Sequence, residues 1–315
     1  MLGYLTRRIV SALLALLGVS VLAFCTTALV PGNPAEVLLG AEATPQRVAA
    51  LTHEMGLDKP LPERYFYWLR SALEGNLGES TLSHQTVTSL IASGLKVTLE
   101  LSALSLLLTI VIAIPLGLLI GSKNDRWWTP HLMFALTIGM SVPGFVTGLI
   151  LIIVFSVKLG WFPAGGFVPF TVDPAQNLKS MVLPCAALAL WLAPPLTRFL
   201  RANTVGVMGE DYVKTAVAKG MTNRRLLLRH VAPNAGIPMI TYLGLQLGTL
   251  IGGAIVTEVI FALPGMGRLG LNSILDRDYP VVQGVVLIVA AGYILVNLLI
   301  DLLYGVLDPR VRVSS

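Results

Sequence analysis

The sequence predicts an all-α integral membrane protein with six transmembrane helices, both termini cytoplasmic, and a long first extracytoplasmic loop. Of its 315 residues, 55% are hydrophobic and only 12% are charged, which is about half the charged fraction of a soluble domain. Six apolar stretches are each long enough to cross a bilayer, which takes about 20 residues per helix. These stretches are residues 9–30, 97–121, 132–157, 181–200, 236–261 and 281–303.

Lysine and arginine are distributed unevenly between the connecting segments. With the N-terminus inside, the inner segments and Arg198 at their rim hold 13 Lys/Arg and 4 Asp/Glu, whereas the outer segments hold 9 and 10. Cytoplasmic loops of membrane proteins carry the positive excess. The asymmetry therefore predicts that residues 31–96 face outside and that residues 201–235, the inner loop, face the cytoplasm.

The predicted organisation has three parts. Residues 1–96 form the N-terminal transmembrane helix and an extracytoplasmic loop. Residues 97–304 form a core of five transmembrane helices that includes the inner loop, and residues 305–315 form a cytoplasmic tail. The first helix is expected to be retained, because its apolar stretch is 22 residues long, which exceeds the usual length of a signal-peptide core.

Several classes of chemistry are not expected in this chain. A phosphate-binding loop needs a Gly-Lys pair, and none occurs, so the chain does not hydrolyse ATP alone. No catalytic residue and no metal site are predicted: His53 and His84 have no cysteine beside them and read as solvated surface residues. The basic excess is assigned to cytoplasmic loops, so no nucleic acid is expected as a partner.

The sequence argues against two alternative functions. A stand-alone secondary transporter usually needs an ionisable group near the middle of a span, and none of the six spans has one. A membrane enzyme such as an intramembrane protease needs a nucleophile–base pair or a metal cluster at depth, and the sequence offers neither.

Glycine and proline recur within the spans. Gly244, Gly248 and Gly252 form one small-residue face on the fifth span, which suits either packing inside the chain or a subunit or path surface. Prolines interrupt several spans and are expected to kink them; they are Pro115, Pro143, Pro184, Pro194, Pro195 and Pro238.

The inner loop contains a predicted short amphipathic helix over residues 210–219. Glu210 and Asp211 stand in its first turn, Lys219 stands in its last, and Gly220 supplies the position after the C-cap. An apolar stripe is predicted on this helix, and its members are Tyr212, Val213, Ala216 and Val217. Such a helix suits either anionic lipid or a groove on a cytoplasmic protein.

The inner loop resembles the cytoplasmic loop of binding-protein-dependent ABC importer permeases, E-A-A-x-x-x-G-x(9)-I-x-L-P. Counting from Gly220 places Lys214, Thr215 and Ala216 at the E-A-A positions and His230 to Pro233 at I-x-L-P. The departures are similar to the dipeptide/oligopeptide/nickel branch, which reads E-D-Y-V/I-R/K-T-A-x-A-K-G and then R-H-x-x-x-N-A-x-x-P. Further motifs in matching order cover nearly the whole chain, including residues 31–34, 56–61, 159–163, 261–268 and 277–284.

The resemblance implies a multi-pass permease subunit in a bacterial or archaeal plasma membrane. It implies four kinds of partner besides membrane lipid: a second homologous permease, two cytoplasmic ATPase subunits, and an extracytoplasmic solute-binding protein. ATP and Mg would be bound by the ATPases, and this chain would need no cofactor. The solute would be a di- or oligopeptide, with nickel, a metal chelate or glutathione as alternatives.

The resemblance also implies which residues couple transport to the ATPases. The expected set comprises Glu210, Asp211, Tyr212, Lys214, Thr215, Ala216, Lys219, Gly220, Arg229, His230 and Pro233. Arg224 and Arg225 are further candidates for pairing with acids on the ATPase.

The sequence predicts a second site at the outer end of the fifth span. An ionised carboxylate close to hydrocarbon is unfavourable unless it is paired or hydrated, and Glu258 has Arg268 as its nearest cation in sequence. We expect either that the two side chains pair at an outer gate or that Glu258 faces water. The gate residues are predicted to be Glu258, Pro264, Gly265, Gly267 and Arg268. The G-x-G-x-x-G pattern at 265–270 is read as a membrane-rim turn, because no βαβ unit surrounds it.

Overall fold

The structure is a computed structural model that describes residues 2–28, 34–54 and 56–307. These residues form helices, and no strand longer than an isolated bridge occurs among them. The helices are α1 Leu2–Ala28, α2 Pro34–Leu39, η1 Gly40–Glu42, α3 Pro45–Glu54, α4 Leu61–Leu73, α5 Val87–Ser122, α6 Trp128–Ser141, α7 Gly144–Leu151, η2 Ile152–Lys158, α8 Pro174–Met208, α9 Asp211–Ala218, α10 Asn223–Leu226, η3 Leu227–Val231, α11 Ala232–Gly253, α12 Ile255–Ile260, α13 Met266–Leu275 and α14 Tyr279–Leu307.

The all-α membrane class is confirmed. Among the described residues, four helices are long and apolar enough to cross a membrane: α1, α5, α8 and α14. A fifth span results if the bent pair formed by α6 and the α7–η2 segment is counted as one. α11 covers most of the predicted fifth span, but many of its side chains lie outside the described part of the chain. The count of six therefore stays a prediction.

The predicted third span, residues 132–157, is not one continuous helix. Its two halves, Trp128–Ser141 and Gly144–Lys158, meet at an angle of 96°. The break falls at Val142 and Pro143, whose ψ angles of 121° and 138° are both extended. A proline disfavours the helical conformation in the residue before it and removes its own amide donor. The sequence predicts that Pro143 interrupts this span, and the structure shows that the helix bends there by 96°.

The other interrupting prolines lie inside continuous helices. Pro115 is within α5, three prolines are within α8, and Pro238 is within α11. Neighbouring helices can hold a proline-containing span together by packing around the freed backbone groups. Proline alone therefore does not tell which span breaks.

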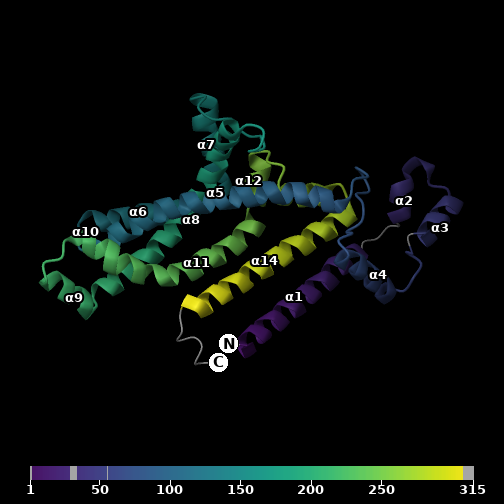
Figure 1. Ribbon diagram of the computed structural model, residues 1–315. Coiled ribbons are helices and arrows are strands. Elements are labelled where there is room, and N and C mark those ends of the chain that lie inside the picture. Colours follow the sequence, from purple (N-terminus) through teal and green to yellow (C-terminus); the bar gives the residue numbers. More distant parts are fainter. Residues whose placement is uncertain (1, 29–33, 55, 308–315) are drawn as a thin grey trace.

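The core is built where α5 packs along α8 (Figure 1). Two glycines of α5 allow the close approach: a Cβ added at Gly117 would meet Leu200, and one at Gly121 would meet Thr204. On α11, Gly244 lies against Ile300 of α14. That glycine therefore serves packing inside the chain, whereas Gly248 and Gly252 lie outside the described side chains.

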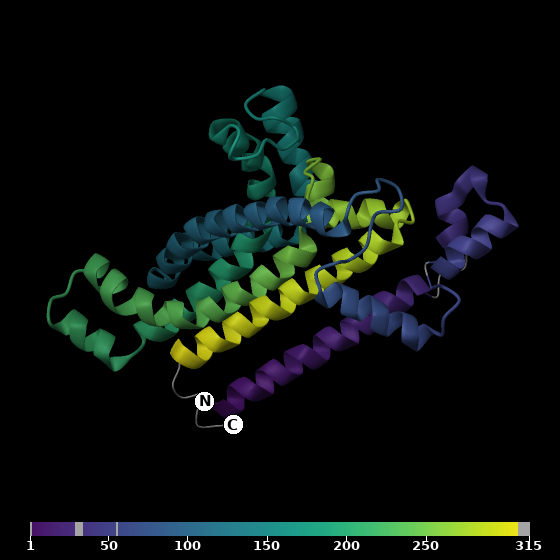
Figure 2. The same ribbon diagram turned by 45° about the vertical axis from the view of Figure 1, so that its right-hand side comes forward.

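The helices of the inner loop and those of the first connecting loop lie at opposite ends of the molecule (Figures 1 and 2). α1 lies beside α14 and runs in the opposite direction, and both views show the start of α1 close to the end of α14 (Figures 1 and 2). α9 and α10 lie toward this end, whereas α2, α3 and α4 lie at the opposite end. α4 is attached to α1 by a hydrogen bond of 2.7 Å between the hydroxyls of Ser20 and Tyr65.

Candidate functional site

The first helix that lies wholly within the inner loop is α9, which follows the end of α8 and itself ends in a turn that only glycine adopts easily. Gly220 has a φ angle of +78°, a left-handed conformation that a Cβ atom disfavours. The amide of Met221 donates to the carbonyl of Ala216 at 3.2 Å, and the amide of Gly220 donates to that of Val217 at 2.9 Å. This bond pair is a Schellman motif. It reverses the chain between α9 and α10.

The predicted apolar stripe on α9 faces in two directions. Val213 and Ala216 are buried, and they pack with Leu226 and Val231 from the returning segment. Tyr212 and Val217 point away from that cluster and keep 45% and 52% of their surface exposed. The loop thus has its own apolar base, and it presents an aromatic ring and an aliphatic side chain outward.

Charged groups are exposed both on α9 and on the returning segment of the inner loop. Lys214 pairs with Asp211 at 2.9 Å within α9, and the Thr215 hydroxyl donates to the Asp211 carbonyl. On the returning segment, Arg224, Arg225 and Arg229 are exposed, and no ion pair among the described residues involves them.

The remaining inner-loop residues of the predicted set lie close by. Glu210 is the N-cap of α9 and makes no side-chain capping bond, while Lys219 is its C-cap. The carbonyl of His230 accepts a bond of 2.7 Å from the Asn234 side chain, and Pro233 lies in the first turn of α11. The structure therefore gathers the set into one helical hairpin.

The second predicted site surrounds Glu258, which is fully buried. The hydroxyl of Thr98 on α5 donates to its Oε1 at 2.6 Å, and the backbone amide of Arg268 donates to its Oε2 at 3.0 Å. Glu258 and Arg268 do meet, but the contact uses the main chain of Arg268. No ion pair between these two described residues is present, so a bond to the backbone replaces the side-chain pairing, and the burial of Glu258 contradicts the alternative that it faces water.

Two glycines that follow Glu258 have no room for a side chain: Gly265 at the end of the turn formed by residues 261–265, and Gly267 in α13. A Cβ added at Gly265 would overlap the carboxyl group of Glu258, and one at Gly267 would overlap Ile255. Ala262 adopts a φ angle of +52°, and the amide of Leu263 donates to the Glu258 carbonyl at 2.8 Å. Pro264 is exposed at the tip.

A second buried carboxylate, which sequence reasoning missed, follows α13. Asp278 is 4% exposed and accepts from the Ser80 hydroxyl at 2.5 Å and the Thr81 amide at 3.1 Å. Its position within the motif at 277–284 was visible in the sequence. The sequence did not indicate its partners Ser80 and Thr81, which lie 198 and 197 residues away along the chain.

Comparisons with known proteins decide the family. The model described as "Binding-protein-dependent transport system inner membrane component" matches residues 113–313, and the model of the N-terminal part of such membrane components matches residues 1–102. The chain belongs to this permease family. The permease is accordingly a transport component of a plasma membrane, which agrees with its several membrane-spanning helices.

Bacterial relatives align with the permease over 99% of its length. A peptide transport system permease protein of Brucella abortus is 39% identical over 312 residues, covering 99% of each chain. The glutathione transport system permease protein GsiC of Escherichia coli K12 is 37% identical over 312 residues, again covering 99% of each chain. These relatives confirm the dipeptide/oligopeptide/nickel branch of ABC importer permeases that the motifs indicated.

A solved structure described as an amino acid ABC transporter with histidines also aligns with the permease. The alignment has a TM-score of 0.47 and 21% identity, and it covers 71% of this chain and 94% of that chain.

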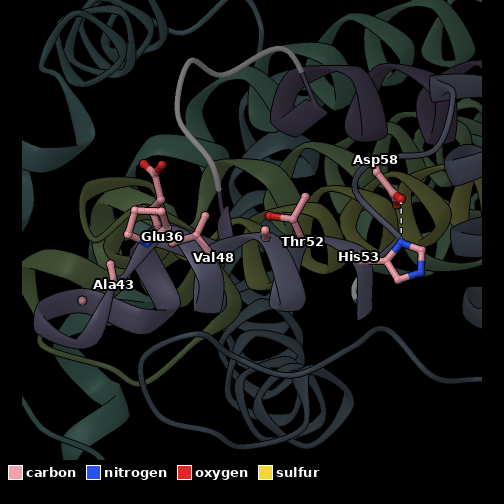
Figure 3. Close-up of a pocket in the computed structure, with 9 residues that line it drawn as sticks. Glu36, Ala43, Val48, Thr52, His53 and Asp58 are labelled. Carbon is pink, nitrogen blue, oxygen red and sulfur yellow. Dashed lines mark hydrogen bonds and ion pairs between the residues drawn. The ribbon is translucent and has the colours of Figure 1, made fainter.

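A pocket lies apart from both sites, between α2 and α3 (Figure 3). It has a volume of about 810 Å³ and is open toward solvent. At one end, His53 Nδ1 donates to Asp58 Oδ2 at 2.8 Å, and this bond lowers the pKa of the Asp58 carboxyl below its ordinary value. No group of three or more His, Cys, Asp and Glu in the described chain is placed to hold a metal ion.

Proposed function

We propose that the permease is one of two homologous membrane subunits of an ATP-driven importer. Two cytoplasmic ATPase subunits would bind ATP and Mg, and an extracytoplasmic solute-binding protein would deliver the solute. The names of the relatives support a di- or oligopeptide as the solute, with glutathione next; nickel or a metal chelate is the remaining alternative. The family matches speak against a stand-alone secondary transporter.

The proposed topology has six spans with both termini cytoplasmic. The close approach of the start of α1 to the end of α14 supports an even number of spans. The inner loop lies toward this end of the molecule and carries six of the 13 inner Lys/Arg, more than any other inner segment. This arrangement agrees with the positive-inside rule.

The proposed mechanism is conformational and includes no covalent step in this chain. ATP closes the ATPase dimer, and the inner loop, seated in a groove of one ATPase, passes that movement to the spans. Access to the path then alternates between the two sides. The observation that carries the docking role is the outward face of α9, where Tyr212 and Val217 stand exposed above a buried base.

The docking role is tested with two variants, each of which replaces one exposed valine by aspartate. Val217→Asp places a charge on the proposed ATPase contact and should reduce co-purification of the ATPases. Val172→Asp is the matched control, because Val172 is 74% exposed and lies in the loop before α8, far from α9. Equal co-purification in both variants would remove the docking assignment.

The solute is tested with the complete complex in proteoliposomes. Uptake of a labelled dipeptide, of glutathione and of nickel is compared with ATP and with ADP inside the vesicles, in the presence of the cognate binding protein. ATP-dependent uptake of a peptide is expected. ATP-dependent uptake of glutathione or nickel alone would replace the peptide assignment, and uptake without ATPases would restore the secondary transporter.

A further inference from the structure

α13 is attached to the N-terminal part of the chain at both of its ends. At its amino end, the amide of Met266 donates to the hydroxyl of Thr98 on α5, and this hydroxyl donates to Glu258 of α12. Beyond its carboxyl end, Ser80, which lies shortly before α5, donates to Asp278. Both carboxylates are buried, and the separations along the chain are 160 and 198 residues. A buried carboxylate that bonds two segments restricts their relative movement, because separation would leave it unpartnered.

The attachment at the amino end is a helix cap supplied by other helices. The first amides of a helix have no partner within it, and the N-cap of α13 is Gly265, which has no capping side chain. The amide of Met266 donates instead to the Thr98 hydroxyl at 2.8 Å, while the amide of Arg268 donates to Glu258. α5 and α12 thus provide the groups that α13 lacks.

Thr98 links Glu258 and Met266 because its hydroxyl both donates and accepts a hydrogen bond. It donates its hydrogen to Glu258 Oε1 at 2.6 Å and accepts from the Met266 amide at 2.8 Å. A hydroxyl has one hydrogen to donate and lone pairs to accept. Valine has the same shape and supplies neither function, whereas serine supplies both.

The attachment completes a continuous set of contacts through the molecule. α9 of the inner loop contacts α8, α8 packs along α5, and α5 contacts α13. We propose that Thr98 and Glu258 are positioning residues that make α5 and α13 move as one unit, so that displacement of the inner loop reaches the outer face. This inference rests on the proposed function, because it assigns a task to the coupling movement.

The test separates coupling from stability by measuring two rates on the same sample. In the complete complex in proteoliposomes, solute uptake and ATP hydrolysis are measured together for Thr98→Val, Thr98→Ser and Glu258→Gln. Loss of a buried hydrogen bond that leaves its partner unsatisfied shifts an equilibrium by about five- to a hundredfold. We expect uptake per ATP to fall about tenfold or more in Thr98→Val and Glu258→Gln and to stay near wild type in Thr98→Ser.

The matched control is Thr109→Val. Thr109 is also a buried threonine of α5, but its hydroxyl donates to the carbonyl of Ser105 within the same helix. A purely structural loss lowers uptake and hydrolysis together, and their ratio stays constant. A wild-type ratio in Thr98→Val, or equal losses in Thr98→Ser and Thr98→Val, would overturn the proposal.

A distance measurement keeps the proposal testable if Thr98→Val does not assemble. Spin labels at Lys96 of α5 and Leu271 of α13, both on exposed positions, are placed in a complex lacking Cys25 and Cys185. Their separation should be the same with ADP and with trapped ATP. A change larger than one helical turn, about 5 Å, would overturn the common movement. Failure of the proposed function itself would appear separately, as absence of ATP-dependent uptake in the wild-type complex.

Discussion

Gly117 of α5 lies directly against Leu200 of α8, so that a Cβ atom at position 117 would stand 2.9 Å from the Cβ of Leu200. Four residues later, Gly121 lies against Thr204 in the same way. The contact between these two helices therefore depends on the absence of side chains along one face of α5.

We expect Gly117→Ala to destabilise the permease by about 1–3 kcal/mol, because the added methyl group overpacks this contact. Gly206→Ala on α8 is the control, since no atom lies within 4 Å of its added Cβ. Alanine should leave stability there unchanged or slightly higher. Thermal unfolding in detergent measures both; equal midpoints for the two variants would contradict the helix contact.

Gly220→Val is expected to abolish coupled uptake while the spans remain inserted. A β-branched residue resists the φ angle of +78° that the Schellman turn needs. Gly220→Asn is the control, because asparagine tolerates left-handed backbone better than other residues. Uptake and ATPase co-purification are measured for each variant, and full uptake in Gly220→Val would refute the docking role of the loop.

The proposed topology predicts the accessibility of two exposed positions. In a chain lacking Cys25 and Cys185, Ser83→Cys should react with an impermeant thiol reagent added outside, and Thr222→Cys should react only after the membrane is opened. Both positions are exposed, so burial does not explain a missing signal. Labelling of Thr222→Cys from outside would contradict the proposed topology.

Asp58 is expected to titrate below its ordinary range because of its bond with His53. A carboxyl whose pKa is lowered on folding stabilises the folded state above its unfolded pKa, and the effect disappears as the pH falls through the folded value. The side chains of His53 and Asp58 are 84% and 46% exposed, so solvent screens the pair and its effect on stability is small. An NMR titration of labelled aspartate should show a higher pKa for Asp58 in His53→Ala than in His84→Ala; equal values would contradict the pairing.

The inner loop was predicted well because its signals are local. Gly220 follows a run of helix-forming residues, and the motif places the acids and the glycine at fixed spacing, so the helix and its end follow from neighbouring residues alone. The prediction that all four apolar side chains share one stripe was wrong. Tyr212 and Val217 face outward because Val213 and Ala216 already fill the contact with the returning segment.

The prolines show a limit of local signals. Pro143 breaks its span by 96°, whereas Pro184 and Pro238 lie within continuous helices. Each proline removes the same backbone donor. Whether the helix then bends depends on the packing around it, and that packing comes from other parts of the chain.

By itself, the sequence determined the membrane class, the approximate positions of the apolar helices, the inner-loop hairpin and the family. These properties follow from composition, the length of apolar runs and short motifs. Only the tertiary structure decided what surrounds Glu258 and Asp278. The sequence offered Arg268 as the partner of Glu258 because its charge is visible, yet the groups that bind the carboxylate are a backbone amide and a distant threonine hydroxyl. Every residue except proline has a backbone amide, so such a donor has no sequence signal, and it acts only where the fold brings it to the carboxylate.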